Sequence, residues 1–269
     1  MTNVDATSGH VTNEDRANDR LLVARGVVKR FGHVRALEHA DFDVFPAEVA
    51  ALVGDNGAGK STLIKILSGT LQPDAGEIWF DGKTRSIASP LAARHLGLET
   101  VYQDLALAAD LDPAANLFLG REIHRPGVLG TLGFLDKKAM REKAKDAFAT
   151  LGIGLQDIDA EVSMLSGGQR QAVAVSRAVT WASRIIFMDE PTAALGVVQA
   201  QRVLDLIRRV RDSGMSVVLI SHNLPQVFEV ADRIQVLRLG KRVATLRPHE
   251  TTMEQVVGAM TGAGAGAEA

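Results

Sequence analysis

The chain has 269 residues, of which 46% are hydrophobic and 23% charged, so it is long and apolar enough to bury a core without disulfide or metal support. Its 30 Lys and Arg nearly balance its 32 Asp and Glu, and this net charge of −2 argues against a dedicated nucleic-acid-binding protein, which usually carries a basic excess. The absence of cysteine excludes disulfides, thiolate zinc sites and cysteine nucleophiles.

Both ends of the chain lack hydrophobic periodicity. Residues 1–20 are polar and contain no apolar stretch of the kind found in a secretory signal, so we expect a disordered leader. Residues 262–269, GAGAGAEA, predict a flexible tail. No apolar run approaches the roughly 18 residues of a transmembrane helix. We therefore expect one ordered domain over 21–261 that is cytoplasmic and reaches a membrane only through a partner.

Hydrophobic patterns predict strands first and then a helical stretch. Strands are expected at 21–29, 41–45, 48–53, 76–81 and 98–102, with a helix at 60–68. From 104 to about 164 the pattern becomes helical, with helices at 113–119 and 136–151 and no strong strand. This stretch predicts a helical subdomain, placed at about 104–181.

Strands and helices alternate in the last third of the chain. Helices are expected from about 169, at 197–211 and at 224–231, and strands at 185–188, 216–220 and 234–239. Such alternation is typical of β–α units on a mostly parallel sheet. The sequence therefore predicts one α/β core with a helical insert.

A glycine-rich segment, here called the phosphate loop (residues 54–62, GDNGAGKST), joins a predicted strand to a predicted helix. It matches G-x-x-x-x-G-K-[ST], in which backbone N–H groups surround a phosphate, the lysine reaches the β- and γ-phosphates and the next hydroxyl ligates Mg²⁺. The helix adds the positive end of its dipole. A turn with an incidental lysine is the alternative, which this context disfavours. The candidate nucleotide-binding residues are Gly54, Asp55, Asn56, Gly57, Ala58, Gly59, Lys60, Ser61 and Thr62.

Two carboxylates end the apolar strand predicted at 185–188. Asp189 is expected to hold Mg²⁺ directly or through water, as is the hydroxyl of Ser61. Glu190 is expected to polarise the attacking water as general base. Many strands end in carboxylates that are merely solvated, and only the phosphate loop favours the catalytic interpretation.

Polar residues also follow two further predicted strands. Gln103 is a candidate for contact with the metal or the water, and His222 for donation to the γ-phosphate. Each alone is more often a turn residue. In open parallel sheets, however, ligands bind beyond the carboxyl ends of the strands, where Gly54, Gln103, Asp189 and His222 are all expected to lie.

A second candidate anion site is the signature (residues 165–169, LSGGQ), which opens another predicted helix. A Ser-Gly-Gly helix start binds anions by the same dipole argument. The alternative is a helix capped by Ser166 without any ligand. From the residues alone, nothing explains why a chain with a phosphate loop needs this second site.

These motifs together resemble the ATPase subunits of ATP-binding-cassette (ABC) transporters, over roughly 21–260. The phosphate loop, Gln103, the signature, the stretch IIFMDE (185–190) and His222 occur in the order of that family. The resemblance implies a P-loop NTPase core with a mostly parallel sheet, an antiparallel β subdomain and an inserted helical subdomain. It also implies ATP and Mg²⁺ as ligands and ATP hydrolysis as the activity.

The resemblance supplies a reason for two anion sites, because cassettes of this family pair head to tail. Each ATP then lies between the phosphate loop of one copy and the signature of the other. The signature residues implied to complete the site across the dimer are Ser166, Gly167, Gly168 and Gln169. The segment after Gln103 is implied to dock on transmembrane permease subunits.

Phe31 and Gly196 stand at positions where the family usually has a particular kind of side chain. The family usually places an adenine-stacking aromatic where this chain has Phe31, and a core phenylalanine is the alternative. At Gly196 the family usually has an aspartate that helps to couple the two sites, so the resemblance leaves the strength of coupling open.

Finer resemblance indicates the branch that imports monosaccharides such as ribose, xylose and fructose. It is carried by residues 101–122, 190–197 and 220–234. A single cassette implies a homodimer, two permease subunits and an extracytoplasmic sugar-binding protein, with this chain on the cytoplasmic side of the membrane and no nucleic acid as partner. The alternatives are an exporter subunit, a soluble ABC ATPase that acts on DNA or ribosomes, and a regulatory module that binds ATP. The basic helix at 136–148 is expected to be a solvated face.

Overall fold

The computed structural model describes residues 19–154, 157–193 and 195–263. The predictions for residues 1–18 of the leader and 264–269 of the tail lie outside the described residues. The strands are β1 Leu22–Phe31, β2 Val34–Val44, β3 Val49–Val53, β4 Ala75–Phe80, β5 Lys83–Thr84, β6 Leu98–Val101, β7 Ile185–Asp189, β8 Ser216–Ile220, β9 Arg233–Arg238 and β10 Lys241–Leu246. The helices are α2 Lys60–Leu67, α3 Pro90–His95, α4 Pro113–Phe118, α5 Val128–Thr131, α6 Lys137–Thr150, η1 Val162–Met164 (a 3₁₀ turn), α7 Gly167–Trp181, α8 Val197–Asp212, α9 Leu224–Val230 and α10 Met253–Thr261.

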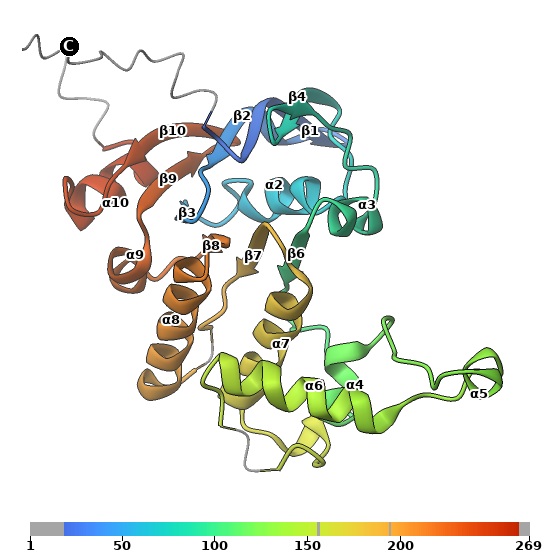
Figure 1. Cartoon of the computed structure of the whole chain (residues 1–269). Helices are drawn as coiled ribbons and strands as arrows, with labels where there is room; N and C mark the ends of the chain where they lie inside the picture. Colours follow the sequence, from blue (N-terminus) through green and yellow to red (C-terminus); the bar gives the residue numbers. More distant parts are fainter. Residues whose placement is uncertain (1–18, 155–156, 194, 264–269) are drawn as a thin grey trace, which may run out of the picture.

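Two sheets form the α/β core, and the fold class is confirmed. A six-stranded sheet has the order β10-β9-β3-β8-β7-β6 and is parallel except for the β10–β9 pair, while β2-β1-β4-β5 form an antiparallel sheet of four. Helix α2 lies between the two sheets (Figure 1). Strands β3 and β8 are buried along their whole length, as parallel strands covered on both faces should be. On the other face of the larger sheet, α7, α8 and α9 complete a second apolar cluster.

The helices between β6 and β7 pack into a third apolar cluster. Its buried members are Ala114, Leu117, Phe118, Met140, Ala144, Phe148 and Val173. The indole N–H of Trp181 donates to the carbonyl of Leu117 at 2.8 Å, which ties α7 to α4. On α6 the apolar side chains face inward and the lysines are exposed, as its helical spacing indicates.

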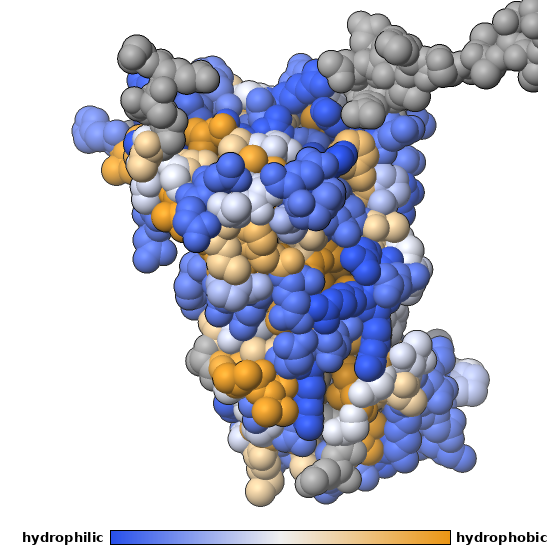
Figure 2. Space-filling model, turned by 90° about the vertical axis from the view of Figure 1, so that its left-hand side faces the viewer, coloured by the Kyte–Doolittle hydropathy of each residue, from blue (hydrophilic) through white to orange (hydrophobic). Residues whose placement is uncertain are grey.

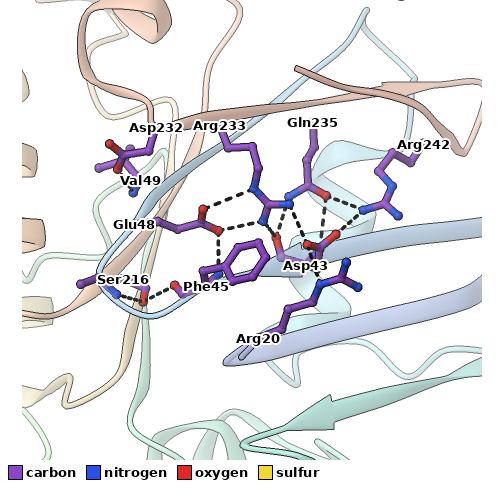
Figure 3. Close-up of polar contacts among 11 residues, drawn as sticks. Arg20, Asp43, Phe45, Glu48, Val49, Ser216, Asp232, Arg233, Gln235 and Arg242 are labelled. Atoms are coloured by element: carbon purple, nitrogen blue, oxygen red, sulfur yellow. Dashed lines mark hydrogen bonds and ion pairs between the residues drawn. The ribbon is translucent and has the colours of Figure 1, made fainter. Parts of the chain in front are cut away.

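A buried ion-pair cluster joins the two sheets at β2, β9 and β10 (Figure 3). The guanidinium of Arg233 contacts Asp43 at 2.7 Å and Glu48 at 2.8 Å, and Arg242 pairs with Asp43 from the other side. Burial acts to raise the pKa of Asp43, but the arginines outweigh this effect and hold the pKa below the ordinary value for an aspartate. For Glu48 burial prevails, and its pKa is raised.

Several elements differ from those expected from the sequence. Strand β2 begins seven residues earlier than the strand expected at 41–45, and α7 begins at Gly167 rather than near Gln169. The elements not expected at all are β5, α3, α5, η1, β10 and α10. Figure 2 shows the side that carries α8, α9 and α10, which is mostly hydrophilic with separate apolar patches. Within the described ranges, no helix has the length and apolar character needed to cross a membrane.

Candidate functional site

The sheet register brings the ends of four parallel strands to one edge. Leu52 of β3 lies opposite Ile220 of β8, which lies opposite Asp189 of β7. Val101 of β6 lies opposite Met188. The segments that follow these strands therefore begin at nearly the same height on the sheet. They contain the phosphate loop, the acidic pair, Gln103 and His222.

Backbone packing fixes the path of the phosphate loop. At Gly54 the φ angle is +155°, and a Cβ there would lie 2.1 Å from the carbonyl oxygen of Leu237. At Gly59 φ is +104°, and a Cβ would lie 2.5 Å from the carbonyl oxygen of Ala36. The loop is thus held between β9 and β2, and only glycine fits at these two positions.

The ammonium of Lys60 points back over the loop. Its Nζ donates to the carbonyl oxygens of Gly54 at 2.6 Å and Asp55 at 3.0 Å. Burial lowers the pKa of Lys60, while the carboxylates of Glu190, Asp189 and Asp55 act against this effect. The Nζ of Lys60 thus lies over the phosphate loop, within electrostatic reach of the acidic pair. Beside it, Ser61 is exposed and Thr62 is half-buried.

The acidic pair has a specific backbone geometry. Glu190 has φ +50°, a value uncommon for residues other than glycine, and its N–H donates to the carbonyl of Ile220 at 2.9 Å. Its Oε1 lies 2.8 Å from Nδ1 of His222, whose side chain is otherwise exposed. Burial, followed by repulsion from Glu190, raises the pKa of Asp189, while Lys60 opposes the shift. The structure thus joins Glu190 and His222 as a pair.

Gln103 and Phe31 lie on exposed parts of the molecule. Gln103 lines a cavity of about 320 Å³ together with Leu107 and Arg170. Phe31 ends β1 and is 50% exposed, so it is not a core residue. The ammonium of Lys29 lies 5.9 Å from the centre of its ring.

The signature lies away from the phosphate loop of its own chain. Ser166 and Gln169 cap α7 reciprocally, because the Ser166 hydroxyl accepts from the Gln169 N–H and the Gln169 amide oxygen accepts from the Ser166 N–H. Helix α7 belongs to the apolar cluster on the opposite face of the large sheet from α2. Ser166 and Gly168 line a separate cavity of about 660 Å³, between α7 and α8. The structure therefore does not bring these candidate residues together with the phosphate loop in one chain.

Sequence reasoning missed Gln199, which packs over the signature. A Cβ at Gly168 would lie 2.8 Å from Cγ of Gln199, and a Cβ at Gly196 would lie 2.8 Å from its Oε1. Gly196 is the N-cap of α8, and its cap lacks a side-chain hydrogen bond. The sequence did contain a signal for this contact. Gln199 is the third residue of a helix that begins after Gly196, and the side chain at that position commonly folds back toward the N-cap.

The residues at the sheet edge fit a magnesium nucleotide. The loop offers open space at Gly57, whose φ is +82°, and carries the buried cation of Lys60. Asp189 supplies a carboxylate oxygen, the kind of ligand that Mg²⁺ prefers. The arrangement can bind a polyphosphate and place a carboxylate, Glu190, beside it.

Comparison with known proteins identifies the family. Residues 37–193 match the family described as ABC transporter, and the chain belongs to that family. It is an ATP-binding cassette, the nucleotide-binding ATPase component of such transporters, and the resemblance found in its motifs is confirmed.

The curated relatives include sugar-import proteins. The chain is 53% identical over 249 residues to the fructose import ATP-binding protein FrcA of Rhizobium meliloti, covering 92% of this chain and 96% of that protein. It is 49% identical to the xylose/arabinose import ATP-binding protein XylG of Sulfolobus acidocaldarius, covering 90% and 94%. It is also 41% identical to the ribose import ATP-binding protein RbsA 1 of Burkholderia cenocepacia. That match covers 90% of this chain but only 46% of the relative, so this chain spans about half of that protein's length. The resemblance to the carbohydrate-importing branch is confirmed.

Solved structures agree on the fold. A nucleotide-free ATP-binding cassette from an ABC transporter has a TM-score of 0.75 and 26% identity, covering 90% of this chain and 95% of that chain. A cassette in the ADP conformation has a TM-score of 0.74 and 26% identity, with the same coverage.

Proposed function

We propose that this chain is the ATP-hydrolysing subunit of a monosaccharide importer. It works as a homodimer on the cytoplasmic side of the membrane, bound to two permease subunits that receive sugar from an extracytoplasmic binding protein. The carrying observation is the Glu190–His222 pair, 2.8 Å apart, at the sheet edge that holds the phosphate loop. The names of the curated relatives support monosaccharides as the cargo.

Binding falls to the phosphate loop. Its backbone N–H groups and the Lys60 ammonium hold the β- and γ-phosphates of ATP, and Phe31 stacks on the adenine. Ser61, Gln103 and Asp189 hold Mg²⁺, which when bound neutralises charge on the β- and γ-phosphates. The exposed ring of Phe31 supports this stacking role, because a stacking aromatic must have a free face.

Proton removal from the attacking water falls to Glu190. Its carboxylate accepts the proton as general base. His222 donates from Nδ1 to Oε1 of Glu190, and in the imidazolium form its Nε2 also carries a proton, which it donates to the γ-phosphate. The positive φ of Glu190 and its backbone bond to Ile220 hold the carboxylate in place on the sheet edge.

The second copy completes the site. The signature is remote from its own phosphate loop, so Ser166 and Gly168 are available to a nucleotide held by a partner. Gly167 and Gln169 shape the same helix start. Head-to-tail pairing of two identical chains then creates two equivalent ATP sites.

The test is uptake of a panel of labelled monosaccharides by cells that lack this chain. Wild type and Glu190→Gln are returned in parallel, the latter as a matched variant that keeps the shape of the side chain. We expect uptake of one sugar to be lost in the deleted cells and restored by wild type alone. Equal restoration by both would remove Glu190 from catalysis, and unchanged uptake of every sugar would contradict monosaccharide import.

A further inference from the structure

The turn that carries Gln103 is fixed on its entry side by the large sheet. It directly follows β6, which is paired along its length with β7. The N–H of Leu105 donates to the carbonyl of Tyr102 at 2.9 Å, so residues 102–105 form a closed β-turn in which Gln103 is the first central residue. Gln103 itself is exposed. Its position therefore depends on how the exit of the turn is held.

The exit of this turn has a strained backbone. Leu105 has φ +61° and Ala106 has φ +46°, both in the left-handed region that residues with a side chain rarely adopt. Two such residues in succession persist only where the surrounding structure enforces them. Leu105 packs against the apolar cluster on the α7 face of the sheet, whereas Ala106 is exposed. Burial of side chains thus accounts for at most one of the two.

Arg177 of α7 supplies the contacts that hold the exit. Its Nη1 donates to the carbonyl oxygen of Ala106 at 2.7 Å, and its Nη2 donates to that of Leu105 at 3.0 Å. Helix α7 packs against β6 (Figure 1), so the guanidinium reaches the turn from a neighbouring regular element. The planar fork of arginine can fix two successive carbonyls at once, which the single ammonium of a lysine does poorly.

The guanidinium of Arg177 is committed to these two carbonyls. Within the described parts of the chain it makes no ion pair and no other hydrogen bond. Burial lowers the pKa of Arg177, and the nearby Glu99, whose charge opposes this shift, is paired with Arg121. A half-buried cation normally needs a carboxylate partner. One that donates to two strained carbonyls instead serves to hold the backbone.

We propose that Arg177 is a positioning residue for Gln103. By holding the left-handed exit of the turn, it keeps the amide of Gln103 at the carboxyl edge of the large sheet, where the proposed Mg²⁺ site lies. This inference rests on the proposed role of Gln103 in ATP hydrolysis. Arg177 belongs to the helix that begins at the signature, so the turn is anchored to the signature helix. A displacement of α7 against the sheet should therefore carry Gln103 with it.

Steady-state ATP hydrolysis by the purified full-length chain tests the link in a double-mutant cycle. Arg177→Lys keeps the charge but lacks the fork, and we expect it to lower kcat by about tenfold while changing KM for MgATP by less than about twofold. In a Gln103→Ala background, where no amide is left to position, Arg177→Lys should lower kcat no further. Arg208→Lys is the matched control. Arg208 on α8 also donates to a backbone carbonyl, that of Glu229, and its replacement should leave kcat unchanged.

The cycle separates failure of this inference from failure of the proposed function. An equal loss of kcat in both backgrounds would overturn the inference, because Arg177 would then act without Gln103. Wild-type kcat in Arg177→Lys would overturn it as well. Wild-type kcat in the single Gln103→Ala variant is a different result, since it contradicts the proposed role of Gln103 and overturns the inference along with it.

Ala106 provides an independent test that leaves Arg177 in place, so it applies even where Arg177→Lys does not fold. Ala106→Gly should keep wild-type kcat, because glycine adopts φ +46° without strain. Ala106→Val should lose kcat as Arg177→Lys does, because a β-branched residue is disfavoured at this φ. Hydrogen exchange of residues 102–108, measured by mass spectrometry, should be faster in Ala106→Val and Arg177→Lys than in wild type. Equal kcat and equal exchange in Ala106→Gly and Ala106→Val would overturn the role of the strained exit.

Discussion

Single residues at the site were predictable where a motif names the chemistry. Lys60, Asp189 and Glu190 could be located because a glycine-rich loop and an apolar strand ending in two carboxylates are local patterns. The contact between Glu190 and His222 was not predictable, since it depends on the register of β7 against β8. The positive φ of Glu190 is likewise a product of tertiary bonds, because no local signal requires it.

We expect MgATP binding to be sensitive to acid, because the pKa of Asp189, the proposed Mg²⁺ ligand, is raised. A carboxylate with a raised pKa becomes protonated at a higher pH than usual, and the protonated form is a poor ligand for Mg²⁺. We therefore expect MgATP affinity to begin to fall, as the pH is lowered, at a higher pH than it would with a carboxyl of ordinary pKa. Isothermal titration of the chain with MgATP at several pH values measures this.

Asp189→Asn is the control for titration of the nucleotide itself. This variant should bind MgATP weakly at every pH and retain only the pH dependence that belongs to ATP. Identical pH profiles for wild type and Asp189→Asn would show that Asp189 does not contribute. ATP titrated in the presence of a chelator should depend less on this residue.

At the scale of elements, strongly patterned segments were predictable and contextual ones were not. Strands β3, β7 and β8 are continuous apolar runs, and their bounds were expected to within about one residue. Strand β10 alternates between exposed and half-buried residues, and it is held by pairing with β9 rather than by its own pattern. Helix α5 buries none of its residues, so hydrophobic periodicity could not locate it.

The ion-pair cluster makes β2 and β9 energetically dependent on each other. Asp43→Asn keeps the shape of the side chain but leaves Arg233 and Arg242 without their shared charge. Breaking one side of a buried pair typically costs about 3 kcal/mol, and we expect a loss of that order in the free energy of unfolding at pH 7. Urea denaturation measures it. Asp81→Asn, which removes the exposed partner of Arg184, should cost less than about 1 kcal/mol.

The sign of the pH dependence follows from the lowered pKa of Asp43. A carboxyl whose pKa is lower in the folded than in the unfolded state contributes stability above its unfolded pKa of about 4. That contribution is lost as the pH falls through the folded value. The free energy of unfolding of wild type should therefore approach that of Asp43→Asn in strong acid. A difference between the two free energies that stays constant down to low pH would contradict the lowered pKa of Asp43.

At the scale of the whole molecule, the separation of the signature from the phosphate loop has consequences for assembly. The helices that begin at these two motifs, α2 and α7, pack on opposite faces of the large sheet. The motif order indicated two anion sites, but the sequence could not say whether the fold brings them together. Whether the two motifs meet in one chain depends on which face of the sheet each helix covers. The direction of each strand–helix–strand crossover determines that face.

Glu190→Gln should therefore form a stable dimer in saturating MgATP, because bound nucleotide joins the two copies while hydrolysis is slow. Size-exclusion chromatography with light scattering should give a mass twice the 28.7 kDa of one chain. Adding Lys60→Ala should keep the protein monomeric by removing nucleotide affinity. Adding Ser166→Arg should preserve nucleotide binding by each chain yet prevent the dimer. A monomer in all three variants would contradict pairing through the signature.

The crowding around Gly54 and Gly59 changes how genetic data on the phosphate loop must be interpreted. Side chains at these positions would strike the backbone at Leu237 and Ala36, and one at Gly240 would lie 3.0 Å from the same Ala36 carbonyl oxygen. Loss of function at any of these three glycines can arise from misfolding alone, and so it says nothing about contact with a ligand. Selection experiments that count tolerated substitutions would score Gly240 as severely as the loop itself. Informative variants are those at side chains that face open solvent, where a change alters chemistry without altering the path of the chain.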